Sequence, residues 1–131
     1  MYMLDTNILI YFFKGQGEVH KRMLATSPQL ISISSVTIFE LETGLLKSAA
    51  PALRRAQLDA LMAAVKILNV DHTVALAAAK IRAGLEAKGQ PIGPLDTLIA
   101  ATALVANASL VTRNVREFER VSGLQLENWF D

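Results

Sequence analysis

Residues 1–13 read MYMLDTNILIYFF, and this opening stretch decides the fold class. A short apolar run at residues 2–4 ends at Asp5, which is the pattern of a buried strand in a parallel sheet. After the acid, apolar residues recur at helical spacing, with Thr6 or Asn7 as the expected N-cap. The stretch therefore predicts a strand followed directly by a helix, with an acidic residue at the junction.

The same alternation of short strands and helices continues along the chain. Further strands are predicted at residues 30–33, 67–70, 109–112 and 124–126. Helices are predicted at residues 17–25, 34–48, 51–65, 71–88, 94–107 and 116–119. Short strands separated by helices imply an α/β fold, with a mainly parallel sheet of four or five strands covered on both faces. Because no repeat, low-complexity tract or linker interrupts the pattern, we expect residues 1–131 to form a single domain.

Composition narrows the class of protein. Of the 131 residues, 52% are hydrophobic and 19% charged, which is typical of a compact folded chain. There is no cysteine and only two histidines occur, which excludes a disulfide framework, a thiolate zinc site and a His-rich metal site. No apolar stretch reaches the roughly 18–20 residues needed to cross a bilayer, and no basic leader precedes the N-terminal apolar run, so we expect a cytoplasmic protein with no membrane partner.

The net charge of +1 gives no strong field for holding nucleic acid, so any such function must rest on a local site. Three carboxylates supply that site. Asp5 ends the first predicted strand, while Glu40 and Asp96 stand on early turns of predicted helices that can aim them at the same sheet edge. Ligands of such sheets bind outside the carboxyl ends of the strands, where the strand order reverses.

Clustered carboxylates repel one another, and a hard divalent cation is the simplest compensation because it prefers oxygen ligands. Mg²⁺ or Mn²⁺ held there can polarise a phosphoryl oxygen and lower the pKa of a bound water. The expected reaction is cleavage of a phosphodiester bond by an activated water, without a covalent enzyme intermediate. Each acid also has a structural interpretation: Asp5 as an N-cap, Glu40 as a buried acid with a partner on a mostly apolar helix, and Asp96 as a first-turn acid favoured by the helix dipole. Their joint occurrence favours the metal site.

Four segments carry a resemblance to a known family. They read, in chain order, LDTNILI (4–10), SSVTIFELETG (34–44), GPLDTLIAATAL (93–104) and LVTRNVREFER (110–120). The set resembles the motif segments of PIN-domain ribonucleases, and most of all the VapC toxins of bacterial toxin–antitoxin pairs. The similarity runs nearly end to end and includes the C-terminal LENWF (126–130).

The resemblance implies a PIN-like three-layer α/β/α sandwich and Mg²⁺- or Mn²⁺-dependent cleavage of RNA. It places metal binding and catalysis on Asp5, Glu40 and Asp96. It also implies a VapB-like antitoxin that blocks the active site, homodimerisation of the toxin with a higher assembly in the complex, and structured RNA as target. The first candidate for that target is a tRNA anticodon region.

The fourth segment departs from the family pattern at one position. Asn114 stands where many relatives carry an acid, and an amide can assist a metal or its water but adds no negative charge. Glu117, three residues on, could contribute instead, which leaves a second metal site open. Thr112 matches a hydroxyl residue that supports this segment, and Asn7 is a further supporting candidate.

Three arginines of the fourth segment are candidates for binding. Arg113, Arg116 and Arg120 could share one side of a short helix and contact RNA phosphate or the acidic part of a partner, although a solvated face explains them at least equally well. Of these, Arg113 and Arg116 are the candidates for substrate binding.

Two other functions compete with a ribonuclease. A receiver-type signalling domain that binds Mg²⁺ would need paired acids after the first strand and a lysine after the last, whereas Thr6 follows Asp5 and no lysine occurs beyond Lys88. A PIN-like binding domain that has lost activity is the second alternative, suggested by Asn114. The acidic cluster itself does not distinguish RNA from DNA as substrate.

Overall fold

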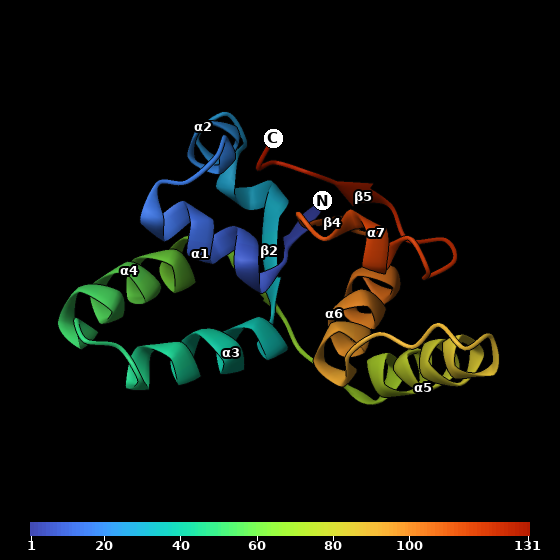
Figure 1. The fold of residues 1–131 in the computed structure, drawn as a ribbon. Helices are drawn as coiled ribbons and strands as arrows, with labels where there is room; N and C mark the ends of the chain where they lie inside the picture. The colour runs from blue at the N-terminus through green and yellow to red at the C-terminus, as the bar shows by residue number, and fades with distance from the viewer.

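Five parallel strands form the centre of the computed structural model, which describes residues 1–131 (Figure 1). The strands are β1 (Tyr2–Leu4), β2 (Ile31–Ser34), β3 (Lys66–Leu68), β4 (Ser109–Val111) and β5 (Leu126–Glu127). Their order in the sheet is β3-β2-β1-β4-β5, and all four neighbouring pairs are parallel. The central strand β1 therefore pairs with β2 on one side and β4 on the other. The strand order reverses at β1, so the expected binding edge is where β1 and β4 end.

Helices cover both faces of this sheet. They are α1 (Thr6–Lys14), α2 (Val19–Leu24), α3 (Ser35–Leu46), α4 (Pro51–Ala64), α5 (His72–Ala87), α6 (Pro94–Val105) and α7 (Val115–Phe118), with a 3₁₀ turn, η1 (Pro28–Leu30). Figure 1 shows α1, α2 and α4 on one side, and α5 and α6 on the other. The predicted α/β/α arrangement with a parallel sheet is confirmed. None of the helices combines the length and apolarity needed to span a bilayer.

The side chains of β1 connect the sheet to both helical layers. Met3 packs into the apolar cluster that includes residues of α6, and Leu4 packs into the opposite cluster, which includes residues of α1 and α4. Both side chains are fully buried, as the two-residue repeat of a strand with both faces covered requires. Burying a side chain of this size stabilises the fold by about 1.5–3 kcal/mol. The first strand thus anchors the residue that follows it, Asp5.

The N-cap of α1 is Asp5, which is the structural interpretation given to this residue from the sequence, and not Thr6 or Asn7. The Asp5 side chain accepts a hydrogen bond from the Thr6 amide. The backbone of Asp5 is extended, which continues the strand by one residue and leaves Thr6 as the first residue of the helix. Asp5 N–H also donates to the Val111 carbonyl at 2.9 Å, next to the last paired residues of β1 and β4.

Other element boundaries move by at most two residues. Helix α2 begins at Val19 because Gly17 has a left-handed backbone with φ +64, which a helix does not allow. A Cβ at Gly17 would also lie 2.6 Å from the Phe130 ring, so the turn requires glycine. Strand β5 begins at Leu126, two residues later than predicted. The predicted cap at Asp71 is confirmed by the hydrogen bond that it accepts from Val74 N–H at 2.9 Å.

Candidate active site

Asp5 lies at the point where the strand order reverses. The residue is only 5% exposed, and two donors hold its carboxylate in place. Thr6 N–H donates to Oδ1 at 2.8 Å, and the Thr112 hydroxyl donates to Oδ2 at 2.9 Å. Asp5 and Thr112 are 107 residues apart in sequence and meet because β1 and β4 are neighbours. Each carboxylate oxygen accepts more than one hydrogen bond or ligand, so both remain available to a further partner.

Glu40 reaches the same region from the second turn of α3. The Thr6 hydroxyl donates to Glu40 Oε1 at 2.6 Å and also lies 3.1 Å from the Thr37 hydroxyl oxygen. Because α3 follows β2 directly and β2 pairs with β1, the start of α1 lies against this turn of α3. From the sequence, Thr6 was expected only as a helix cap, and its contact with Glu40 was not predicted. The signal that could have indicated this role is a hydroxyl residue directly after an acid at a strand end.

Asp96 stands in the first turn of α6 and is half-buried. Burial is the largest cause that raises its pKa from 3.8 to about 7. The negative charges of Asp5, Glu117 and Glu40 raise the pKa further, as does a hydrogen bond with the Glu117 carboxyl. The N-terminal end of the helix dipole favours the charged form, but burial and neighbouring carboxylates outweigh it.

The pKa of Asp5 shows the same mutual influence. Burial raises it, the hydrogen bonds from Thr112 and Thr6 lower it, and the charges of Glu40 and Glu117 raise it again; the net direction is upward. Four acids from four helices or strand ends therefore act on one another. We refer to Asp5, Glu40, Asp96 and Glu117 as the acidic cluster.

Asn114 and Glu117 belong to the segment around α7. Asn114 N–H donates to the Thr112 hydroxyl oxygen at 3.0 Å, and its side-chain amide donates to Glu117 Oε2. Asn114 thus connects Thr112, which holds Asp5, to Glu117. Glu117 brings a negative charge close to Asp96, whereas Asn114 itself adds none.

The donor set suits a hard divalent cation, because it consists of carboxylate oxygens, whose negative charges repel one another unless a cation lies between them. The predicted direct convergence of Asp5, Glu40 and Asp96 on one ion is nevertheless not found. No group of three or more His, Cys, Asp or Glu side chains is arranged to hold an ion. In this structure Glu40 accepts a hydrogen bond from Thr6, and Glu117 accepts one from Asn114.

Comparison with known proteins identifies the family. The family model described as "PIN domain" matches residues 2–124. The chain belongs to the PIN-domain family. It is 37% identical over 128 residues to the tRNA(fMet)-specific endonuclease VapC of Salmonella typhimurium, covering 98% of this chain and 97% of that protein. The resemblance inferred from the four motif segments is confirmed, and a receiver-type signalling domain is excluded.

Solved structures give the same result for the fold of this PIN domain. A chain of VapBC2 from Rickettsia felis, crystallised bound to a DNA fragment from its promoter, matches with a TM-score of 0.90 and 35% identity, covering 98% of both chains. A chain of DNA-bound VapBC from Salmonella typhimurium also has a TM-score of 0.90, with 36% identity over 98% of this chain and 97% of that chain.

The remaining predicted residues of the PIN domain lie around the cluster. The Arg113 guanidinium carbon lies 3.6 Å from the centre of the Phe130 ring, and its Nη1 lies 3.4 Å from the Tyr11 hydroxyl. Arg113 precedes α7 and Arg116 lies within it, so the two do not share a helix face as predicted. Asn7 is exposed in the first turn of α1 and makes no side-chain hydrogen bond.

Proposed function

We propose that this chain is a divalent-metal-dependent endoribonuclease of the VapC type, formed by a single domain over residues 1–131. The observation that carries the proposal is the half-buried Asp96, with a pKa of about 7, beside the buried Asp5 at the switch point of the sheet. Such an arrangement of acids is unfavourable without a cation and marks a functional site. The 37% identity to a protein named as a VapC endonuclease, which extends over 98% of this chain, supports the nuclease class.

Asp5 and Asp96 are proposed to contact Mg²⁺ or Mn²⁺ directly. Magnesium keeps several waters and is usually bound through one or two carboxylates plus substrate phosphate, so this pair suffices. The ion, when bound, supplies polarisation of the phosphoryl oxygen and a lower pKa for water. Glu40 and Glu117 then act through hydrogen bonds to water. Because Thr6 occupies Oε1 of Glu40, Oε2 remains free to accept a hydrogen bond from an attacking water.

Thr112 and Asn114 have positioning roles in this proposal. The Thr112 hydroxyl holds Asp5 Oδ2, and the Asn114 side chain holds Glu117. Arg113 and Arg116, which lie on the exposed side of this segment, are proposed to contact RNA phosphates. Arg113 is restrained for this task by its stacking on Phe130.

The proposed substrate is RNA, with tRNA as the first candidate because the Salmonella typhimurium relative is named as a tRNA(fMet)-specific endonuclease. The proposed partner is a VapB-like antitoxin, since the similar solved structures are VapBC complexes. Homodimerisation, and a higher assembly with the antitoxin, stay predictions from the resemblance.

Cleavage of an in vitro initiator-tRNA transcript with and without Mg²⁺ tests the proposal. Replacing Asp5 or Asp96 by Asn should lower the cleavage rate at least ~10²-fold, the loss typical of a catalytic group. The matched pair on α3 is E40Q against E42Q, since Glu42 is paired with Arg55 and lies outside the acidic cluster. E40Q should lose activity, and E42Q should cleave like the unsubstituted chain.

If D5N and D96N both cleaved RNA at the unsubstituted rate with Mg²⁺ present, the proposed site would be wrong. Calorimetric titration with Mg²⁺ distinguishes a metal-dependent nuclease from an inactive binding domain, because the inactive domain would bind no ion. A single-stranded DNA of the same sequence, incubated in parallel, tests whether the substrate is RNA alone.

A further inference from the structure

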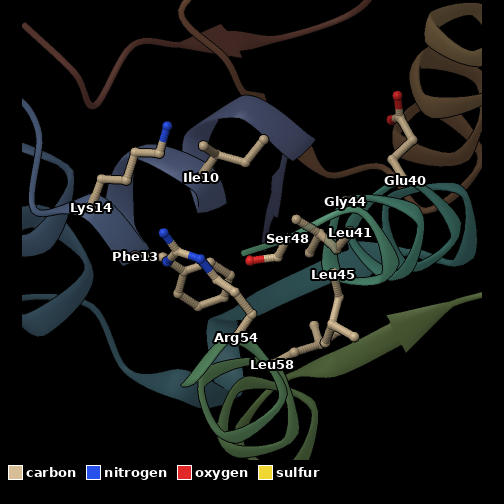
Figure 2. A pocket seen from close by; sticks show the side chains of 10 residues that line it. All are labelled: Ile10, Phe13, Lys14, Glu40, Leu41, Gly44, Leu45, Ser48, Arg54 and Leu58. Carbon is tan, nitrogen blue, oxygen red and sulfur yellow. The ribbon is translucent and has the colours of Figure 1, made fainter. Parts of the chain in front are cut away.

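A cavity of about 280 Å³ adjoins the acidic cluster between α1, α3 and α4. Glu40 forms one end of it, and Lys14 and Arg54 stand at the other end, with the Ser48 hydroxyl between them (Figure 2). Most of the remaining wall is aliphatic or aromatic. Its volume is near the lower limit of the roughly 300–1,000 Å³ of whole-ligand pockets, so it suits a part of a larger molecule.

The two cations of this cavity have no acidic partner. Arg54 Nη1 donates to the neutral Gln57 side chain at 2.8 Å, and neither Arg54 nor Lys14 forms an ion pair. The contrast with the next residue is sharp. Arg55 lies 2.7 Å from Glu42 and 3.4 Å from Asp59, and these carboxylates raise its pKa above the ordinary arginine value.

Charge explains why a nuclease needs such a pair. The whole chain carries a net charge of only +1, and the four acids of the cluster repel a polyanion. A strand of RNA that brings one phosphate to the cluster must therefore bring its flanking phosphates to local cations. Lys14 and Arg54 are cations of the cavity whose wall includes Glu40; Arg54 is partly buried there, which reduces the screening of its charge by water, and Lys14 is exposed.

We propose that Lys14 and Arg54 form a phosphate-binding subsite for the RNA backbone on the α1/α4 side of the scissile bond. The proposal rests on the proposed ribonuclease function and adds the path of the substrate. Arg54 is partly buried and restrained by Gln57, so its guanidinium presents a fixed pair of donors to a phosphate. Lys14 adds a mobile charge from the last turn of α1, and the Ser48 hydroxyl can donate to the same phosphate.

The test measures binding and its salt dependence. All variants are made in a D96N background so that a fluorescent initiator-tRNA transcript stays intact, and binding is followed by fluorescence anisotropy. R54Q is expected to weaken binding about tenfold, the loss of one hydrogen bond between charged groups. It should also flatten the plot of log affinity against log salt by about 0.7, the value for one phosphate contact on a single strand.

Three further variants make the result specific. R54K should keep the salt slope because it keeps the charge, and K14Q should flatten the slope as R54Q does. R55Q is the matched control: an arginine one position away on the same helix, already neutralised by Glu42 and Asp59, which should change neither affinity nor slope. Thermal melting of each variant confirms that the fold is kept.

If R54Q and K14Q bound RNA with the affinity and slope of R55Q, the subsite would be disproved, even if the unsubstituted chain cleaves tRNA. If R54Q and K14Q weakened binding while the unsubstituted chain cleaved no RNA, the subsite would stand and the proposed nuclease function would fail. Normal RNA binding by R54Q, with loss of binding to a labelled oligoglutamate peptide, would assign the cavity to an acidic protein partner and overturn the proposal.

Discussion

Replacing Asp96 by Asn should change how the stability of the protein depends on pH. The side chain is half-buried among Asp5, Glu40 and Glu117, and in the folded state its pKa is raised to about 7. A carboxyl group with a raised folded pKa stabilises the fold while it is protonated. That contribution is fully present below the unfolded value of 3.8 and is lost as the pH rises through about 7.

The size of the effect follows from the pKa. A rise from 3.8 to about 7 corresponds to about 4 kcal/mol at 1.36 kcal/mol per pH unit. Because the side chain is only partly buried, solvent screening reduces this to about 1–3 kcal/mol. Between pH 4 and pH 8, in EDTA, the unsubstituted protein should therefore lose about 1–3 kcal/mol more stability than D96N, whose amide does not titrate.

Urea unfolding followed by the fluorescence of Trp129, the only tryptophan and a buried one, measures this difference. E42Q is the control, because Glu42 lies outside the acidic cluster and its pKa is lowered by Arg55. The reasoning would be refuted if D96N and the unsubstituted protein showed the same change in unfolding free energy between the two pH values.

Three further predictions follow from the same contacts. Mg²⁺ at about one hundred times its dissociation constant should stabilise the unsubstituted protein at pH 8 by about 2.7 kcal/mol in thermal melting, and D96N by less; equal shifts would contradict direct binding by Asp96. T112V should lower the free energy of unfolding in urea by about 1–3 kcal/mol, because Asp5 loses a donor and the Asn114 amide loses an acceptor. T112S should restore that stability, and failure to do so would attribute the loss to packing. T6V should reduce the rate of tRNA cleavage about tenfold by releasing Glu40, and T6S should recover it; an active T6V would show that this hydrogen bond does not matter.

The order and type of the elements could be predicted from local patterns. Apolar runs, helical spacing and caps such as Asp71 act within a few residues, so the sequence alone indicated strands separated by helices and a parallel sheet. The prediction failed where a local choice depended on distant contacts. Gly17 could not begin a helix because its turn packs against Phe130, a residue at the other end of the chain.

Asp5, Glu40 and Asp96 were recognisable as candidate residues because acids after a strand, or on early turns of helices, can point to the same edge of an α/β sheet. Their mutual effects were not readable from the sequence. Burial raises the pKa of Asp96, and burial depends on how α6 packs, which no local pattern reports.

The sequence by itself determined which elements form and which acids stand at their ends, because both depend on short-range periodicity and capping. Only the tertiary structure decided that β1 lies beside β4, and so that the Thr112 hydroxyl meets Asp5. It also decided that Arg55 is paired with carboxylates while Arg54 lines a cavity. Two adjacent arginines are chemically identical in sequence, and the packing of α4 against α1 and α3 distinguishes them.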